Sequence, residues 1–193
     1  MTLVVPSLER LPAYEAALRR GFWSDNLRRE QSRDEELASI AAEPAAFVAS
    51  LNDREGRAGP ITLSDGTQVK RLPGFRRWMW DETANDSSAD SGFCGSIGFR
   101  WQPGTAALPD YVLGHIGYAV VPWKQRRGYA TRALGLMLAE ARNVGLPHVE
   151  LTTDPDNEAS QKVITANGGV FVERFRTVAG HGGKEELRWR IAL

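Results

Sequence analysis

The chain has 193 residues, with 24 lysines and arginines balanced by 24 aspartates and glutamates, and a hydrophobic fraction of 42%. This length fits one domain with its own core, and the composition excludes a disordered chain. Zero net charge gives no electrostatic reason to expect nucleic acid or an anionic membrane as a partner. Cys94 is the only cysteine, so neither an intrachain disulfide nor a thiolate metal cluster can form.

Targeting and metal-binding patterns are also missing from the sequence. No run approaches the about 18 apolar residues of a membrane span, and residues 1–10 lack the layout of a signal peptide. The 3 histidines are scattered, so their spacing predicts no metal site. We therefore expect a cytoplasmic protein.

Residues 1–60 are expected to form a helical front. Leu8, Tyr14 and Phe22 belong to a hydrophobic series at three- and four-residue steps, which is the spacing of one helix face. The polar stretch 24–36 is interpreted as a solvated helical surface, and residues 45–51 as a further short helix.

The remainder predicts a sheet flanked by helices. Strands are predicted over residues 75–81, 93–101 and 115–121, with the polar stretch 83–92 as the turn of a hairpin. Later strands are predicted over residues 149–153, 170–175 and 187–191. An amphipathic helix begins at Tyr129, and a second follows Asp156 or Asn157 as its cap. The fold class is therefore α/β or α+β, with a mixed sheet.

The strongest chemical signal lies in residues 118–130, which read as a strand, a tight loop and a helix. A helix start has unpaired N–H groups and the positive end of the helix dipole, which together attract anions. Gly128 allows a ligand to approach the backbone closely. Lys124, Arg126 and Arg127 would oppose the helix dipole, so they are better explained by a bound polyanion such as a pyrophosphate.

Two common phosphate motifs are absent. The sequence has no G-x-x-x-x-G-K-[ST], which excludes the ATP-binding P-loop. It also has no G-x-G-x-x-G after a strand, because Gly92, Gly95 and Gly98 fall at the wrong spacing inside a predicted strand.

The segment Gln125-Arg126-Arg127-Gly128-Tyr129-Ala130 resembles the [Q/R]-x-x-G-x-[G/A] acyl-CoA loop of the GNAT superfamily of N-acetyltransferases. The resemblance covers about residues 75–193, and the stretches 115–118 and 167–169 look like a poorly characterised bacterial branch. It implies one domain over residues 1–193, with an acyl-CoA-binding core at 75–193 and an acceptor side at 1–60. It also implies a mostly antiparallel sheet that is splayed between strands four and five.

The resemblance also implies which residues hold acetyl-CoA as cosubstrate. Backbone N–H groups of the loop would bind the pyrophosphate, and the strand end at Val120 would hold the pantetheine arm and polarise the thioester. Asn157 would bind a pantetheine amide. The full set implied in cofactor binding is Val120, Val121, Gln125, Arg126, Arg127, Gly128, Tyr129, Ala130, Thr131, Asn157 and Ser160.

The catalytic residues are less well defined. Many family members carry a tyrosine as general acid about seven residues after the asparagine, where this chain has Ile164. A water, Tyr118 or Tyr129 could replace it. His115 is the first candidate for the general base, with a role in fixing its strand as the open alternative, and Glu150 is the second candidate.

We expect an acyl-CoA-dependent N-acyltransferase that transfers acetyl to a primary amine by direct attack in a ternary complex. The acceptor would be a small-molecule or peptide amine, and a homodimer stays an open question. The alternatives are a non-catalytic acyl-CoA-binding module or sensor and an adaptor for another phosphate ligand.

Overall fold

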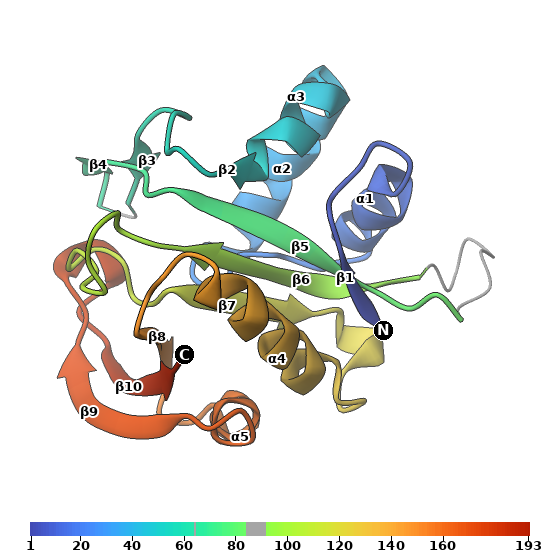
Figure 1. Ribbon diagram of the computed structural model, residues 1–193. Helices are drawn as coiled ribbons and strands as arrows, with labels where there is room; N and C mark the ends of the chain where they lie inside the picture. The colour runs from blue at the N-terminus through green and yellow to red at the C-terminus, as the bar shows by residue number, and fades with distance from the viewer. Residues whose placement is uncertain (64, 84–91) are drawn as a thin grey trace.

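The computed structural model describes residues 1–63, 65–83 and 92–193. The strands form a larger sheet, a smaller sheet and a short hairpin, and helices cover both faces of the larger sheet (Figure 1). The prediction of a mixed fold with mostly antiparallel strands is therefore confirmed. The polar turn predicted over residues 83–92 lies outside the described residues, except for its two ends.

The larger sheet combines strands from distant parts of the chain. Its order is β1-β5-β6-β7 with β2 beside β5, and all neighbours are antiparallel. The register places Gly98 opposite Gly117 and Ser96 opposite Ala119. The three long strands agree closely with the prediction, whereas the two short ones were not predicted. Their bounds are β1 Thr2–Val4, β2 Asn52–Asp53, β5 Gly74–Trp80, β6 Phe93–Arg100 and β7 Ile116–Val120.

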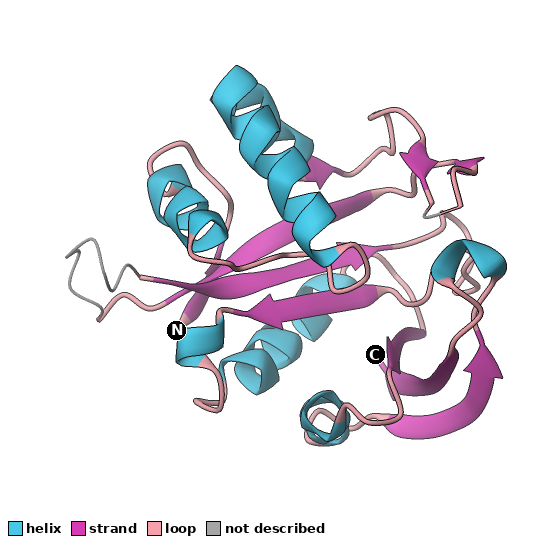
Figure 2. Cartoon of the chain, turned by 180° about the vertical axis from the view of Figure 1, so that it is seen from behind, coloured by secondary structure: helices cyan, strands magenta, loops and turns pink. Residues whose placement is uncertain are grey.

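The smaller sheet has the order β8-β10-β9 and is also antiparallel. Seen from behind, it carries the C-terminus and lies apart from the larger sheet (Figure 2). Because β7 and β8 belong to different sheets, the expected splay between these strands is confirmed. The bounds are β8 His148–Thr153, β9 Val170–Arg176 and β10 Glu185–Ala192, and the hairpin joins β3 Ile61–Thr62 to β4 Gln68–Val69.

Helices cover the larger sheet on both faces. Helices α1, α2 and α3 lie over one face, and α4 lies over the other (Figure 1). Trp78 and Phe93 pack toward α1, while Ile97 and Phe99 pack toward α4. Phe93 faces the opposite side from Ile97 because the β5–β6 pairing is irregular between Met79 and Trp80, which shifts the alternation by one residue. The bounds are α1 Leu11–Arg19, α2 Arg29–Ala42, α3 Pro44–Ser50, α4 Tyr129–Arg142 and α5 Glu158–Thr165.

The N-terminal helices differ from the prediction in two places. Helix α1 begins only at Leu11, and Leu8 lies outside it with 53% of its surface exposed. Residues 24–28 are not helical, because the Asp25 carboxylate accepts hydrogen bonds from the N–H groups of Leu27 and Arg28 and so forms a turn.

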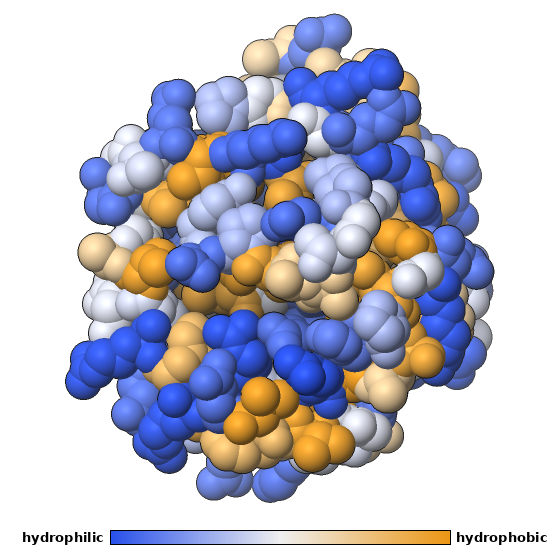
Figure 3. Space-filling model, turned by 60° about the vertical axis from the view of Figure 1, so that its left-hand side comes forward, coloured by the Kyte–Doolittle hydropathy of each residue, from blue (hydrophilic) through white to orange (hydrophobic). Residues whose placement is uncertain are grey.

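Within residues 1–63, 65–83 and 92–193, no helix is both long and hydrophobic enough to cross a membrane. On the face in Figure 3, hydrophobic side chains form separate patches among hydrophilic ones. The exposed hydrophobic residues include Val170 and Phe171 of β9.

Candidate functional site

Strands β7 and β8 meet at one end of β7 and then diverge. The His115 N–H donates to the Glu150 carbonyl at 2.7 Å, and the Glu150 N–H donates to His115 Nδ1 at 2.9 Å. A Cβ atom on Gly114 would lie 3.0 Å from the same carbonyl, so the close approach of the strands requires glycine there. Beyond this contact, β7 pairs with β6 and β8 pairs with β10.

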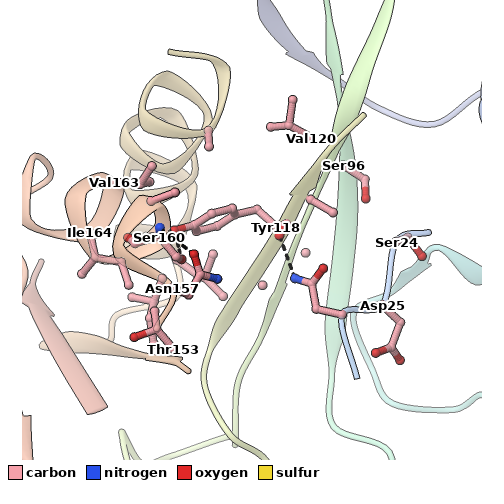
Figure 4. Close-up of a pocket in the computed structure, with 18 of the residues that line it drawn as sticks. Ser24, Asp25, Ser96, Tyr118, Val120, Thr153, Asn157, Ser160, Val163 and Ile164 are labelled. Carbon is pink, nitrogen blue, oxygen red and sulfur yellow. Dashed lines mark hydrogen bonds between the residues drawn. The ribbon is translucent and has the colours of Figure 1, made fainter. Parts of the chain in front are cut away.

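A cavity of about 750 Å³ lies where the strands diverge. Its lining includes β7, the end of β8, the start of α5 and the turn before α4, with residues 21–27 on the side of α1. Figure 4 shows Tyr118 between the sheet and α5, with Ser24 and Asp25 on the opposite side. Residues 21–27, the front loop, are fixed to β7 by Asn26, whose amide donates to the Tyr118 carbonyl at 3.0 Å.

The turn before α4 has the geometry of an anion cradle. Arg126 and Gly128 both have positive φ angles, of 63° and 76°, and no side chain caps the helix. Among the described residues, no acceptor is found for the N–H groups of Arg126, Arg127 and Gly128. A Cβ atom on Gly128 would meet no atom within 4 Å. Successive N–H groups in such a turn form a concave site for an anion at the positive end of a helix.

Most residues predicted to bind the cofactor lie at this cavity, and two do not. The lining contains Val120, Gln125, Arg126, Gly128, Tyr129, Ala130, Thr131, Asn157 and Ser160. The Arg127 side chain is exposed to solvent, so only its N–H belongs to the turn. Val121 is buried in the core, and its N–H donates to the Cys94 carbonyl at 3.0 Å.

Asn157 is poised to bind a ligand through one end of its amide. Its Oδ1 accepts the N–H of Ser160 at 3.0 Å and so caps α5, as the sequence predicts (Figure 4). Its Nδ2 makes no hydrogen bond with the described residues. The same side chain therefore starts the helix and offers a donor to the cavity.

Tyr118 reaches across the opening to α5. Its hydroxyl lies 2.7 Å from Ser160 Oγ (Figure 4). Burial raises the pKa of Tyr118 to about 12, so the hydroxyl keeps its proton near neutral pH. Tyr129 also lines the cavity, but its hydroxyl donates to Asp81 Oδ2 at 2.8 Å. Ile164, at the position of the usual tyrosine, is fully buried.

His115 and Glu150 are poorly placed to act as bases. The His115 side chain is 0% exposed, and burial lowers its pKa to about 4. Burial also opposes ionisation of Glu150, but hydrogen bonds from Arg190 and Arg188 outweigh it and lower the pKa of Glu150. Neither residue lines the cavity. The alternative in which His115 fixes its strand fits this geometry, and the hypothesis of a general base does not.

Two polar residues at or beside this cavity were missed by sequence reasoning. Glu36, assigned to a solvated surface, lies behind the lining, where it accepts hydrogen bonds from Ser24, Tyr14 and Arg76 and ties the front loop to the sheet. Glu186 is 4% exposed and lines the cavity, and burial raises its pKa. No local pattern marks these residues, since each is exposed or buried only through contacts distant in sequence. In the described parts of the chain, no cluster of three His, Cys, Asp or Glu residues could hold a metal.

The sequence matches the model of one protein family. A sequence model of the family described as acetyltransferase (GNAT) domain matches residues 26–170. A comparison with curated protein sequences finds no match.

Solved structures share the fold at low sequence identity. A microcin self-immunity acetyltransferase in complex with acetyl-CoA and AMP has a TM-score of 0.57 at 11% identity, covering 100% of this chain and 92% of that one. A spermidine N-acetyltransferase variant from Vibrio cholerae has a TM-score of 0.57 at 12% identity, covering 100% and 95%. A ribosomal-protein alpha-N-acetyltransferase in complex with coenzyme A has a TM-score of 0.57 at 12% identity, covering 99% and 93%.

We predict that His115 makes stability depend on pH. Its pKa is about 4 in the folded protein and near 6.5 when unfolded, so the unfolded state takes up the proton first as pH falls. The free energy of unfolding that depends on His115 is complete above pH 6.5 and is lost toward pH 4. Between pH 7 and pH 5 the loss is about 2 kcal/mol.

Urea unfolding at both pH values, with His115→Asn as the reference, measures this loss. Asparagine still accepts the Glu150 N–H but does not titrate. An equal pH dependence in the two proteins would contradict the prediction.

Proposed function

Because the chain belongs to the GNAT acetyltransferase family, we propose that it transfers an acetyl group from acetyl-CoA to a primary amine. The observation that carries this proposal is the turn of free N–H groups beside an opening between diverging strands. We further propose that residues 1–193 act as one unit, with residues 1–60 on the acceptor side. The front loop, which lines the cavity opposite α5, supports this division.

Acetyl-CoA would bind mainly through the backbone. The N–H groups of residues 126–130 would hold the pyrophosphate, and the amide of Asn157 would donate to a pantetheine carbonyl. The arm would then enter the opening beside Val120, which lines the cavity. A backbone donor at that strand end would stabilise the negative charge that develops on the thioester oxygen.

The reaction then needs one proton removed and one supplied. The amine attacks the thioester carbonyl carbon, and the C–S bond breaks. A base must accept the proton that the amine loses, and an acid must donate a proton to the CoA thiolate. Tyr118 is the proposed donor to the thiolate, because it is protonated and lies at the opening. It would replace the tyrosine whose usual position is occupied by Ile164.

Glu186 is the proposed acceptor of the amine proton. It is a buried carboxylate in the lining of the cavity, on β10 beside β8. Burial raises its pKa, which brings it closer to the range where a general base works near neutral pH. Unlike Glu150, it forms no ion pair with the described residues.

The proposed function predicts that the purified protein releases CoA from acetyl-CoA when it is offered a panel of amines. Gly128→Glu should weaken acetyl-CoA binding at least tenfold, because a carboxylate there blocks and repels the pyrophosphate. Calorimetry measures the binding, and a thiol reagent measures the CoA released.

Gly145→Glu is the matched control. Gly145 also has a positive φ and open space around it, but it follows α4 at the opposite end from the turn. Equal affinity for acetyl-CoA in both variants would show that the turn at Gly128 does not bind the pyrophosphate. Tight binding without transfer to any amine would instead support a non-catalytic acyl-CoA-binding module.

Tyr118→Phe should lower kcat by roughly a hundredfold, at the lower end of what a positioned general acid contributes, because the CoA thiolate is a tolerable leaving group. The affinity for acetyl-CoA should stay unchanged, because the pyrophosphate contacts are elsewhere. Steady-state kinetics and calorimetry on the same preparation separate the two effects. An unaltered kcat at saturating substrates would mean that water or another group protonates the thiolate.

Glu186→Gln should lower kcat/KM for the amine and remove the acidic limb of its pH profile. The limb reports ionisation of the base, and glutamine cannot ionise. Glu185→Gln, at the exposed neighbouring residue paired with Arg174, should leave the profile unchanged. A profile of the same shape in all three proteins would exclude Glu186 as the base.

A further inference from the structure

A second cavity, of about 920 Å³, continues from the acceptor side of the first. It is bordered by α2, α3 and β5, and it shares part of its lining with the first cavity. The acceptor half is therefore large enough for more than an amine on a short chain. The residues that line both cavities are Asp25, Leu27, Arg76, Gly98, Arg100 and Lys184.

The floor of this junction is bare backbone with one arginine above it. Gly98 and Gly117 lie opposite each other on β6 and β7, on the face toward α1. A Cβ atom on Gly98 would meet only the Phe75 carbonyl, at 3.8 Å, and one on Gly117 would lie 3.6 Å from Arg100 Nη2. The guanidinium of Arg100 thus lies beside Gly117, at the point where the cavities join, and the space above Gly98 is open.

Of the charged side chains at the junction, two have hydrogen-bond partners and two have none within the described residues. Arg76 donates to Glu36 at 2.8 Å, and Asp25 is held by the N–H groups of its own turn. Arg100 and Lys184 form no side-chain hydrogen bond or ion pair within the described part of the chain. The Arg100 side chain is exposed to the cavity, where the Asp25 carboxylate favours its charge and the Arg76 guanidinium opposes it. A guanidinium that faces a cavity without a hydrogen-bonded partner can bind an anion there through charge-assisted hydrogen bonds.

We propose that the acceptor is a small amine that also carries a carboxylate or phosphate group, and that Arg100 binds this group. The inference rests on the proposed acetyl transfer and specifies its substrate class. The planar guanidinium can donate two parallel hydrogen bonds to either anion, with Lys184 adding positive charge. A polyamine is disfavoured beside Arg100, because it would bring further positive charge to a guanidinium that has no hydrogen-bonded partner within the described residues.

Matched pairs of amines test this specificity. An amino acid and its amide differ in the carboxylate, and phosphoethanolamine and ethanolamine differ in the phosphate. We expect kcat/KM to be at least tenfold higher for the anionic member of one or both pairs, and the preferred pair identifies the anion. Arg100→Gln should abolish the preference and leave acetyl-CoA affinity unchanged. Arg100→Lys should retain part of it, because the charge remains while the paired donors are lost.

Arg57→Gln is the control, since the Arg57 side chain is 82% exposed and lies outside both cavities. Calorimetric titration of the same compounds into the CoA-bound protein provides a readout that needs no turnover. Anion binding that depends on Arg100 without transfer would refute the acetyl transfer and keep the anion site. If the amides, ethanolamine or spermidine are acetylated with a kcat/KM equal to or higher than that of the anionic amines, the anion site is refuted while the acetyl transfer is supported.

Discussion

The site depends on the contact at which β7 leaves β8. There the neutral ring of His115 accepts the Glu150 N–H at 2.9 Å, where a continued ladder would use a carbonyl. The imidazole thus gives the Glu150 N–H a hydrogen-bond acceptor at the point where the backbone pairing of the two strands ends. Each strand then follows a different sheet, and the space between them becomes the cavity. Burial lowers the pKa of the ring and makes it a weak base, and its Nδ1 lone pair is already engaged with the Glu150 N–H.

The two halves of the cavity offer ligands different kinds of groups. The half beside α4 presents backbone N–H groups, whose placement depends on two positive φ angles and hardly on side-chain identity. The half that we propose for the acceptor presents side chains from separate elements, and Glu36 connects some of them by bonding Tyr14, Ser24 and Arg76. A shared backbone cradle with variable side chains opposite to it suits a family whose members differ in what they modify.

Local patterns in the sequence predict the fold well and the acceptor site poorly. The helix from Tyr129 and the cap at Asn157 are set by residues close in sequence, and both were predicted. Strand β1 was missed, because three residues pair with β5 more than 70 positions away and have no repeating pattern of their own. The burial of His115 and the exposure of Arg100 to a cavity likewise arise only when distant segments meet. Residue type alone therefore left both roles open for the histidine.

The paired glycines of β6 and β7 also bear on how this protein could change. Gly98 and Gly117 leave room above them, and neither is held in a conformation that only glycine adopts. Larger residues could therefore be accommodated one methyl group at a time, each raising the floor of the acceptor half without repacking the core. Selectivity for smaller acceptors is thus within reach of single substitutions, whereas wider selectivity would require the helices above to move.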